Sequence, residues 1–161
     1  MNGELFIASR YKDYFSKNTN KEMDLIQVFG YDFHKTKHSI TFDADFANLL
    51  IKANPRPDFQ TEDKFLKDVA EGYDKEDVKV KYADLSKPGI CVEIMSDDFV
   101  TPITILIDGH HRAIKAYQEK LAFRVCMLTQ QEVIMCLVST TDLRLIPGLQ
   151  QSITNSYELK E

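Results

Sequence analysis

The fold of this chain is organised around residues 103–120, which read Ile103-Thr-Ile-Leu-Ile-Asp-Gly-His-His-Arg-Ala-Ile-Lys-Ala-Tyr-Gln-Glu-Lys120. Its first five residues, Ile103 to Ile107, are apolar or β-branched, which is typical of a buried strand. Asp108-Gly109 then interrupts the run, since glycine adopts backbone angles that other residues avoid. From residue 110 onward the apolar residues recur at helical spacing, which predicts a helix over 110–120. The apolar side of that helix carries Ala113, Ile114, Ala116 and Tyr117, and the polar side carries His111, Arg112, Lys115 and Glu119.

The turn between strand and helix is a candidate anion site. A helix N-terminus has free backbone N–H groups and a partial positive charge. Arg112 can add a bidentate fork, and His111 can donate to the same anion or act as an acid or base. Asp108 either binds a metal attached to the ligand or caps the helix, and both interpretations stay open. His110 lies on the apolar side, which predicts a structural role. Because Arg112 lies on the polar side, we expect its loss to affect binding and hardly change folding.

The sequence Asp108-Gly109-His110-His111-Arg112 after an apolar strand resembles the signature of the ParB/sulfiredoxin superfamily. Members of that superfamily carry Gly-Glu-Arg-Arg, Gly-Cys-His-Arg or Asp-Gly-His-His-Arg where the helix opens. The resemblance covers roughly residues 90–128 and implies that residues 109–112 cradle nucleotide phosphates. It also implies phosphoryl transfer, nucleotide hydrolysis with Mg²⁺ or nuclease activity, for which His111 and Asp108 are the candidate catalytic residues.

Two departures from the superfamily pattern narrow the expected activity. His110 stands where sulfiredoxins have their reactive cysteine, so we do not expect sulfinate reduction. The chain does not continue into the helix-turn-helix and dimerisation segments of full ParB proteins, so we do not expect chromosome partitioning. Metal-dependent catalysis usually needs a carboxylate pair or an activated nucleophile, and the box itself contains only Asp108. A non-catalytic module that keeps the fold and binds a ligand or a protein therefore remains the alternative.

The pattern along the chain predicts one α/β domain over residues 1–161 with a mixed sheet, in which 1–40 and 152–161 are peripheral. A strand at 123–128 follows the central helix. We therefore expect residues 103–128 to form a β-α-β unit whose two strands are parallel and adjacent. Helical spacing and capping residues predict further helices at 46–52, 62–71 and 130–138, and apolar patterns predict further strands at 39–42, 78–82 and 90–95.

Two groups of residues outside the box are further candidates. Arg56, between two prolines, and Lys52 can supply a second basic contact to the phosphate, although a Pro-Arg-Pro sequence is also typical of a rigid turn. His34 and His38 have a spacing that can place two metal ligands on one helix face. Lysines surround these histidines and no nearby acid completes a site, so surface histidines are the alternative.

Composition excludes several classes of protein. The net charge of −5 argues against broad, nonspecific binding of nucleic acid, which needs a basic face, but a local basic patch and a DNA partner stay open. No apolar run approaches the ~18–20 residues of a membrane span, and no signal peptide is visible, so we expect a cytoplasmic protein. Cys91, Cys126 and Cys136 are widely spaced in apolar segments, which predicts free thiols in the core.

Overall fold

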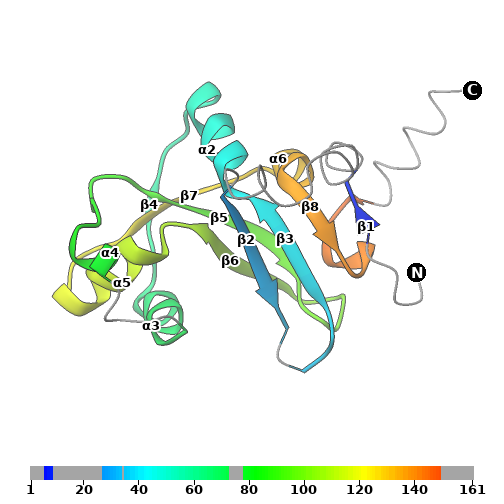
Figure 1. Cartoon of the computed structure of the whole chain (residues 1–161), viewed down its shortest axis with the longest axis horizontal. Coiled ribbons are helices and arrows are strands. Elements are labelled where there is room, and N and C mark those ends of the chain that lie inside the picture. Colours follow the sequence, from blue (N-terminus) through cyan, green and yellow to red (C-terminus); the bar gives the residue numbers. More distant parts are fainter. Residues whose placement is uncertain (1–5, 9–26, 34, 73–77, 150–161) are drawn as a thin grey trace, which may run out of the picture.

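The computed structural model describes residues 6–8, 27–33, 35–72 and 78–149, which fold into two four-stranded sheets and several helices (Figure 1). The first sheet is antiparallel, with the strand order β1 (Phe6–Ile7), β8 (Leu137–Thr140), β3 (Ser39–Asp43) and β2 (Val28–Asp32). The second sheet is mixed, with the order β4 (Phe59–Gln60), β7 (Arg124–Met127), β5 (Gly89–Met95) and β6 (Pro102–Asp108). The helices are α2 (Ala44–Ala53), α3 (Asp63–Glu71), α4 (Val78–Lys81), α5 (His110–Glu119), α6 (Gln130–Cys136) and the 3₁₀ helix η2 (Leu143–Leu145). The predicted α/β class with a mixed sheet is confirmed.

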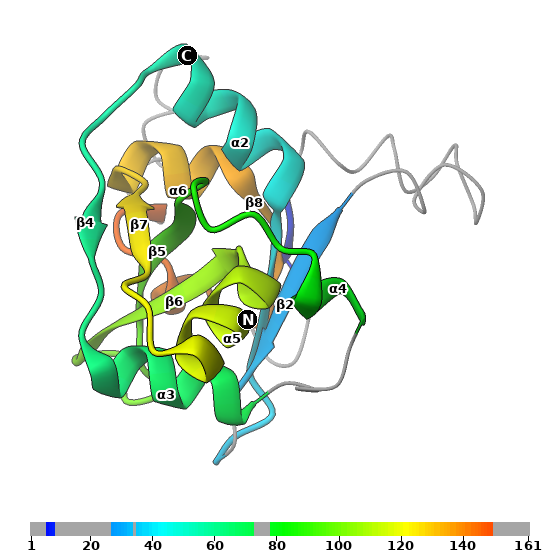
Figure 2. The same cartoon turned by 90° about the vertical axis from the view of Figure 1, so that its left-hand side faces the viewer.

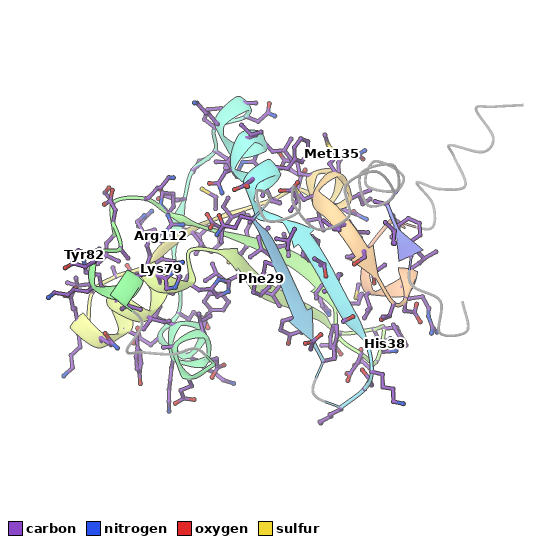
Figure 3. All side chains as sticks on the ribbon, in the orientation of Figure 1. Phe29, His38, Lys79, Tyr82, Arg112 and Met135 are labelled. Atoms are coloured by element: carbon purple, nitrogen blue, oxygen red, sulfur yellow. The ribbon has the colours of Figure 1, made fainter. Side chains whose placement is uncertain are left out.

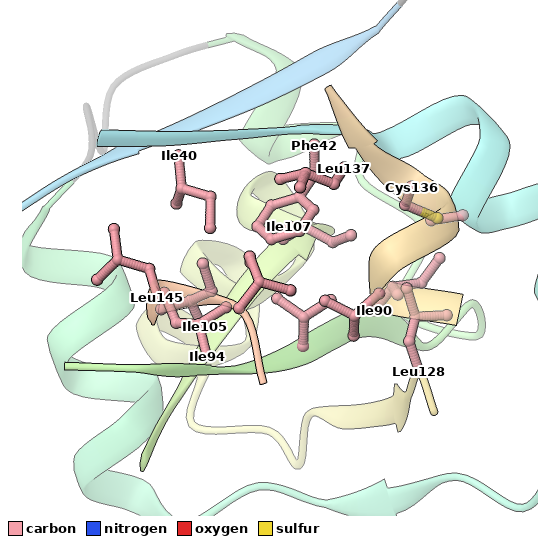
Figure 4. Packing of buried hydrophobic residues seen from close by; sticks show 14 of the residues in the cluster. Ile40, Phe42, Ile90, Ile94, Ile105, Ile107, Leu128, Cys136, Leu137 and Leu145 are labelled. Carbon is pink, nitrogen blue, oxygen red and sulfur yellow. The ribbon is translucent and has the colours of Figure 1, made fainter. Parts of the chain in front are cut away.

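The main core lies between the two sheets, whose apolar faces pack against each other (Figure 4). The first sheet contributes buried residues such as Phe42 and Leu137, and the second contributes Ile94 and Ile107. A smaller core lies on the other face of the second sheet, where α5 and α3 pack (Figure 2). Because β5 and β6 are covered on both faces, their sequences read as nearly continuous apolar runs.

The predicted pairing of the strands at 103–107 and 123–128 is wrong. Strand β5 lies between β6 and β7, pairing with β6 in antiparallel fashion and with β7 in parallel fashion, so β6 and β7 run in opposite directions. The reason is the short connection at 96–101, which lets β5 and β6 pair as neighbours in the chain. The remaining edge of β5 then accepts β7, and α5 carries the chain past β5 to reach it.

Two further boundaries differ from the sequence prediction. The alternating residues 78–82 predict a strand, but 78–81 form the short helix α4. That turn buries Val80 against Ile114 of α5, and burial of one apolar side chain outweighs a weak five-residue alternation. The helix predicted over 130–138 ends at Cys136, because Leu137–Thr140 pair with β3 as strand β8. The helices expected at 46–52 and 62–71 and the strands expected at 39–42 and 90–95 are confirmed.

The three cysteines are buried and free, as predicted. Burial raises the pKa of the Cys91 thiol to about 12, because a thiolate would lose its hydration there. Within the described ranges, no helix is long and apolar enough to span a bilayer.

A part-buried ion pair fixes the connection that follows α2. The Nη2 atom of Arg56 donates to Oε2 of Glu132 at 2.6 Å, and its Nη1 atom donates to Oε1 of the same carboxylate. Glu132 also accepts from the Thr129 backbone N–H, completing the capping box that opens α6. Arg56 donates further to the carbonyls of Asn54 and Met127, so one guanidinium joins three segments.

This pair makes stability depend on pH. The hydrogen bond from Arg56 lowers the pKa of Glu132 from 4.5 to about 2, so the folded state favours the carboxylate. The stabilisation is fully present above pH 4.5 and is lost as pH falls from 4.5 toward 2. We expect Glu132→Gln to lower the free energy of unfolding near neutral pH and to flatten its decline in that acid window. Urea unfolding at several pH values measures both effects. The control is Glu71→Gln, which removes an exposed ion pair to Lys67 and should change little. If the free energy of unfolding of Glu132→Gln fell with acid as steeply as that of the wild type, this account would be contradicted.

Candidate functional site

A second part-buried ion pair lies at the junction of β6 and α5. Asp108 ends β6, and its Oδ2 atom accepts from Nη2 of Arg112 at 3.1 Å and from Nδ2 of Asn48 at 3.1 Å. The Nη1 atom of Arg112 donates to the backbone carbonyls of Lys87 and Pro88, each at 3.0 Å. The Arg112 side chain is only 12% exposed. It therefore joins the strand end, the first turn of α5 and the loop before β5.

The position of Arg112 contradicts one expectation from the sequence. Helical periodicity places Arg112 on a polar face where its loss would hardly change folding, but the loop at 87–88 covers that face. Removing the guanidinium would leave the carbonyls of residues 87 and 88 without this donor and would leave Asp108 with Asn48 as its donor and no cation beside it. Helix capping by Asp108 is also wrong, because the N-cap position belongs to Gly109.

Gly109 allows the close approach of backbone segments at this junction. Its φ of 104° lies in the left-handed region, which residues with a Cβ rarely adopt. A Cβ at this position would lie 3.0 Å from the Cα of Gly89 and 3.0 Å from Nη2 of Arg112. The glycine thus lets β6 turn sharply into α5 beside the start of β5.

A pocket of about 280 Å³ opens at the first turn of α5. Residues 107–112 form one side of it, and Gln27, Val28, Phe29 and Ala44 form the other. The first intrahelical hydrogen bond of α5 runs from the Ala113 N–H to the Gly109 carbonyl. The amides of residues 110–112 precede that bond, so they lie at the partly positive end of the helix.

The two histidines of the box have different surroundings. The His110 ring stacks on Phe29, with centroids 4.7 Å apart and planes 21° apart, and is hydrogen-bonded to the Leu106 backbone. Burial lowers the pKa of His110 to about 4, so its ring is neutral at pH 7. This placement agrees with the structural role predicted for it. His111 is partly exposed and lines the pocket.

The side chains of Phe29 and Arg112 approach this pocket from different parts of the chain. Phe29 comes from β2 in the first sheet and Arg112 from α5 beside the second (Figure 3). Sequence reasoning missed Phe29, Gln27 and Asn48. Phe29 has the apolar neighbours of an ordinary core strand, and nothing in the local pattern marks Asn48 as the partner of Asp108.

The candidates outside the box lie elsewhere. Arg56 is paired with Glu132, and neither Arg56 nor Lys52 is among the described residues that line the pocket. His34 is outside the described residues, and Nδ1 of His38 lies 3.1 Å from Oγ1 of Thr141. Within 6–8, 27–33, 35–72 and 78–149, no cluster of three or more histidine, cysteine or acidic side chains can hold a metal.

Comparisons of this chain with protein-family models, with characterised proteins and with solved structures give no match. The resemblance of the box to the ParB/sulfiredoxin signature therefore stays a prediction.

The structure predicts that Arg112→Ala destabilises the fold. Loss of charge-assisted hydrogen bonds to a mostly buried group should lower the free energy of unfolding by about 1.5–3 kcal/mol. Arg112→Lys should restore only part of this, because an ammonium cannot reproduce the planar fork. Chemical denaturation measures the loss.

The matched control is Arg124→Ala. Arg124 pairs with Asp58 at 2.5 Å but is 53% exposed, so its removal should cost at most about 1 kcal/mol. Equal losses of unfolding free energy in Arg112→Ala and Arg124→Ala would mean that the Asp108–Arg112 pair contributes no more to stability than a surface pair.

Proposed function

We propose that this protein binds a phosphate-bearing ligand, such as a nucleotide, in the pocket at the first turn of α5. One observation carries the proposal: a pocket of about 280 Å³ is lined by the residues of the first turn of α5, including His111. A phosphate at this position interacts favourably with the positive end of the helix dipole.

The electrostatics of the pocket are compatible with an anion. Asp108 would repel a phosphate by itself, but its Oδ2 atom is shared by Arg112 and Asn48, which offsets its charge. His110 contributes no charge at pH 7, because burial keeps its ring neutral. His111 is therefore the side chain of the pocket best suited to donate a hydrogen bond to the phosphate.

The arrangement favours binding over catalysis. Asp108 is the one carboxylate among the described residues of the pocket lining, and its Oδ2 atom is engaged by two donors. A Mg²⁺-dependent phosphoryl transfer or nuclease reaction, which the superfamily resemblance implies, usually uses a carboxylate pair or an activated nucleophile. The second candidate, a non-catalytic module that recognises a phosphate ligand, needs neither.

A thermal-shift screen with ATP, ADP, CTP and GTP, each with and without Mg²⁺, tests the proposal. We expect at least one nucleotide to raise the melting temperature, since binding to the folded state alone stabilises it. Calorimetric titration should then show that His111→Ala lowers the affinity for that nucleotide by roughly tenfold, which corresponds to the loss of one charge-assisted hydrogen bond. The melting temperature of the ligand-free variant should change little, because His111 is partly exposed.

The matched control is Glu119→Ala, an exposed position at the other end of the same helix. It should leave nucleotide affinity within about twofold of the wild type. Equal affinity in His111→Ala and the wild type would contradict the placement of the phosphate. Release of phosphate or nucleoside from the bound nucleotide would show an enzyme, and its absence with retained binding would show a module.

A further inference from the structure

A second pocket adjoins the first. It has a volume of about 490 Å³ and lies between β2, β6 and α3, two of which are the end strands of different sheets. Its size falls within the roughly 300–1,000 Å³ usual for small-molecule sites. Its walls are mainly apolar, formed by Phe29, Tyr31, Phe65, Val69, Ile103 and Ile105.

The two pockets share Phe29 and His110. These are the residues whose rings stack 4.7 Å apart, so the stacked pair stands at the boundary between the pockets. A molecule with its phosphate at the first turn of α5 therefore lies next to the apolar pocket. The shared residues distinguish this pocket from the larger one of about 670 Å³ at the opposite end of α5, which includes neither ring.

Charge decides which part of a ligand the second pocket accepts. Its charged side chains among the described residues are Asp32 from β2 and Asp68 from α3, both exposed. Carboxylates repel a further phosphate and accept hydrogen bonds from hydroxyl or amino groups. Aromatic walls such as Tyr31 and Phe65 favour a flat ring, since rings stack or meet edge to face.

We propose that the second pocket holds the uncharged ring portion of the ligand whose phosphate occupies the first. The inference rests on the proposed function and specifies the ligand class: a phosphate ester of a ring system that carries hydroxyl or amino donors. Inorganic phosphate and short aliphatic phosphates fill only the first pocket. Val69, Thr104 and Asp68 are then residues that determine specificity.

Calorimetric titration with inorganic phosphate, glycerol 3-phosphate and the four nucleoside monophosphates AMP, CMP, GMP and UMP tests this assignment. At least one nucleoside monophosphate should bind about tenfold or more tightly than the first two probes. Val69→Trp fills the second pocket from α3. It should reduce the affinity for that nucleotide to the affinity for inorganic phosphate. The affinity for inorganic phosphate itself should not change.

The control is Lys67→Trp, which places the same ring on an exposed position of α3 outside the pocket lining. It should alter neither affinity. Thr104→Tyr, an exposed strand position in the same pocket, gives a second test if Val69→Trp does not fold. The larger side chain should likewise weaken binding of the nucleotide without weakening binding of inorganic phosphate.

The outcomes separate this inference from the proposed function. Sensitivity to His111→Ala with equal affinities for all six probes would overturn the ring site and leave the phosphate site standing. Pocket-filling variants that leave the nucleotide affinity unchanged would also overturn the ring site alone. Absence of binding by every probe would overturn the phosphate site and the ring site together.

Discussion

The ion pair between Asp108 and Arg112 is the interaction on which the rest of the site depends. It forms where β6 ends and α5 begins, and both side chains are largely removed from water. Removing one partner of such a pair leaves the other charge buried without compensation, which costs far more than losing a surface pair. Because Arg112 also holds the carbonyls of residues 87 and 88, the pair fixes the start of β5 against the first turn of α5.

The two sheets determine what faces this junction. Packing of the sheets through Phe42, Ile94 and their neighbours brings β2 close to the first turn of α5, although the two segments are about eighty residues apart in sequence. The contact between Phe29 and His110 follows from that packing. A strand of one sheet and a helix beside the other thus form the pocket together.

Much of the fold could be predicted from local sequence. The break at Asp108-Gly109, the capping box of α6 and the apolar periodicity of α3 all marked elements that the structure contains. The order of strands could not be predicted, since a strand, a helix and a strand do not specify whether a third strand lies between them. The turn of helix at 78–81 was missed because burial of Val80 against another helix is a tertiary effect.

The candidate site shows the same division between local and tertiary information. The sequence located the turn and separated the core-side His110 from His111, because both depend on helical periodicity. It could not reveal that a loop twenty-five residues earlier covers Arg112, or that Asn48 shares the carboxylate of Asp108. A charged residue on the outer face of a helix looks solvent-exposed until its covering segment is known.

The most direct measurement of the central claim is an amide ¹H–¹⁵N chemical-shift titration of the ¹⁵N-labelled protein with inorganic phosphate and then with AMP. Binding at the start of α5 predicts saturable shifts that are largest at the amides of Gly109, His110, His111 and Arg112. These groups form the turn and the first turn of the helix. Shifts that do not saturate, or that are largest at amides remote from this turn, would contradict the account.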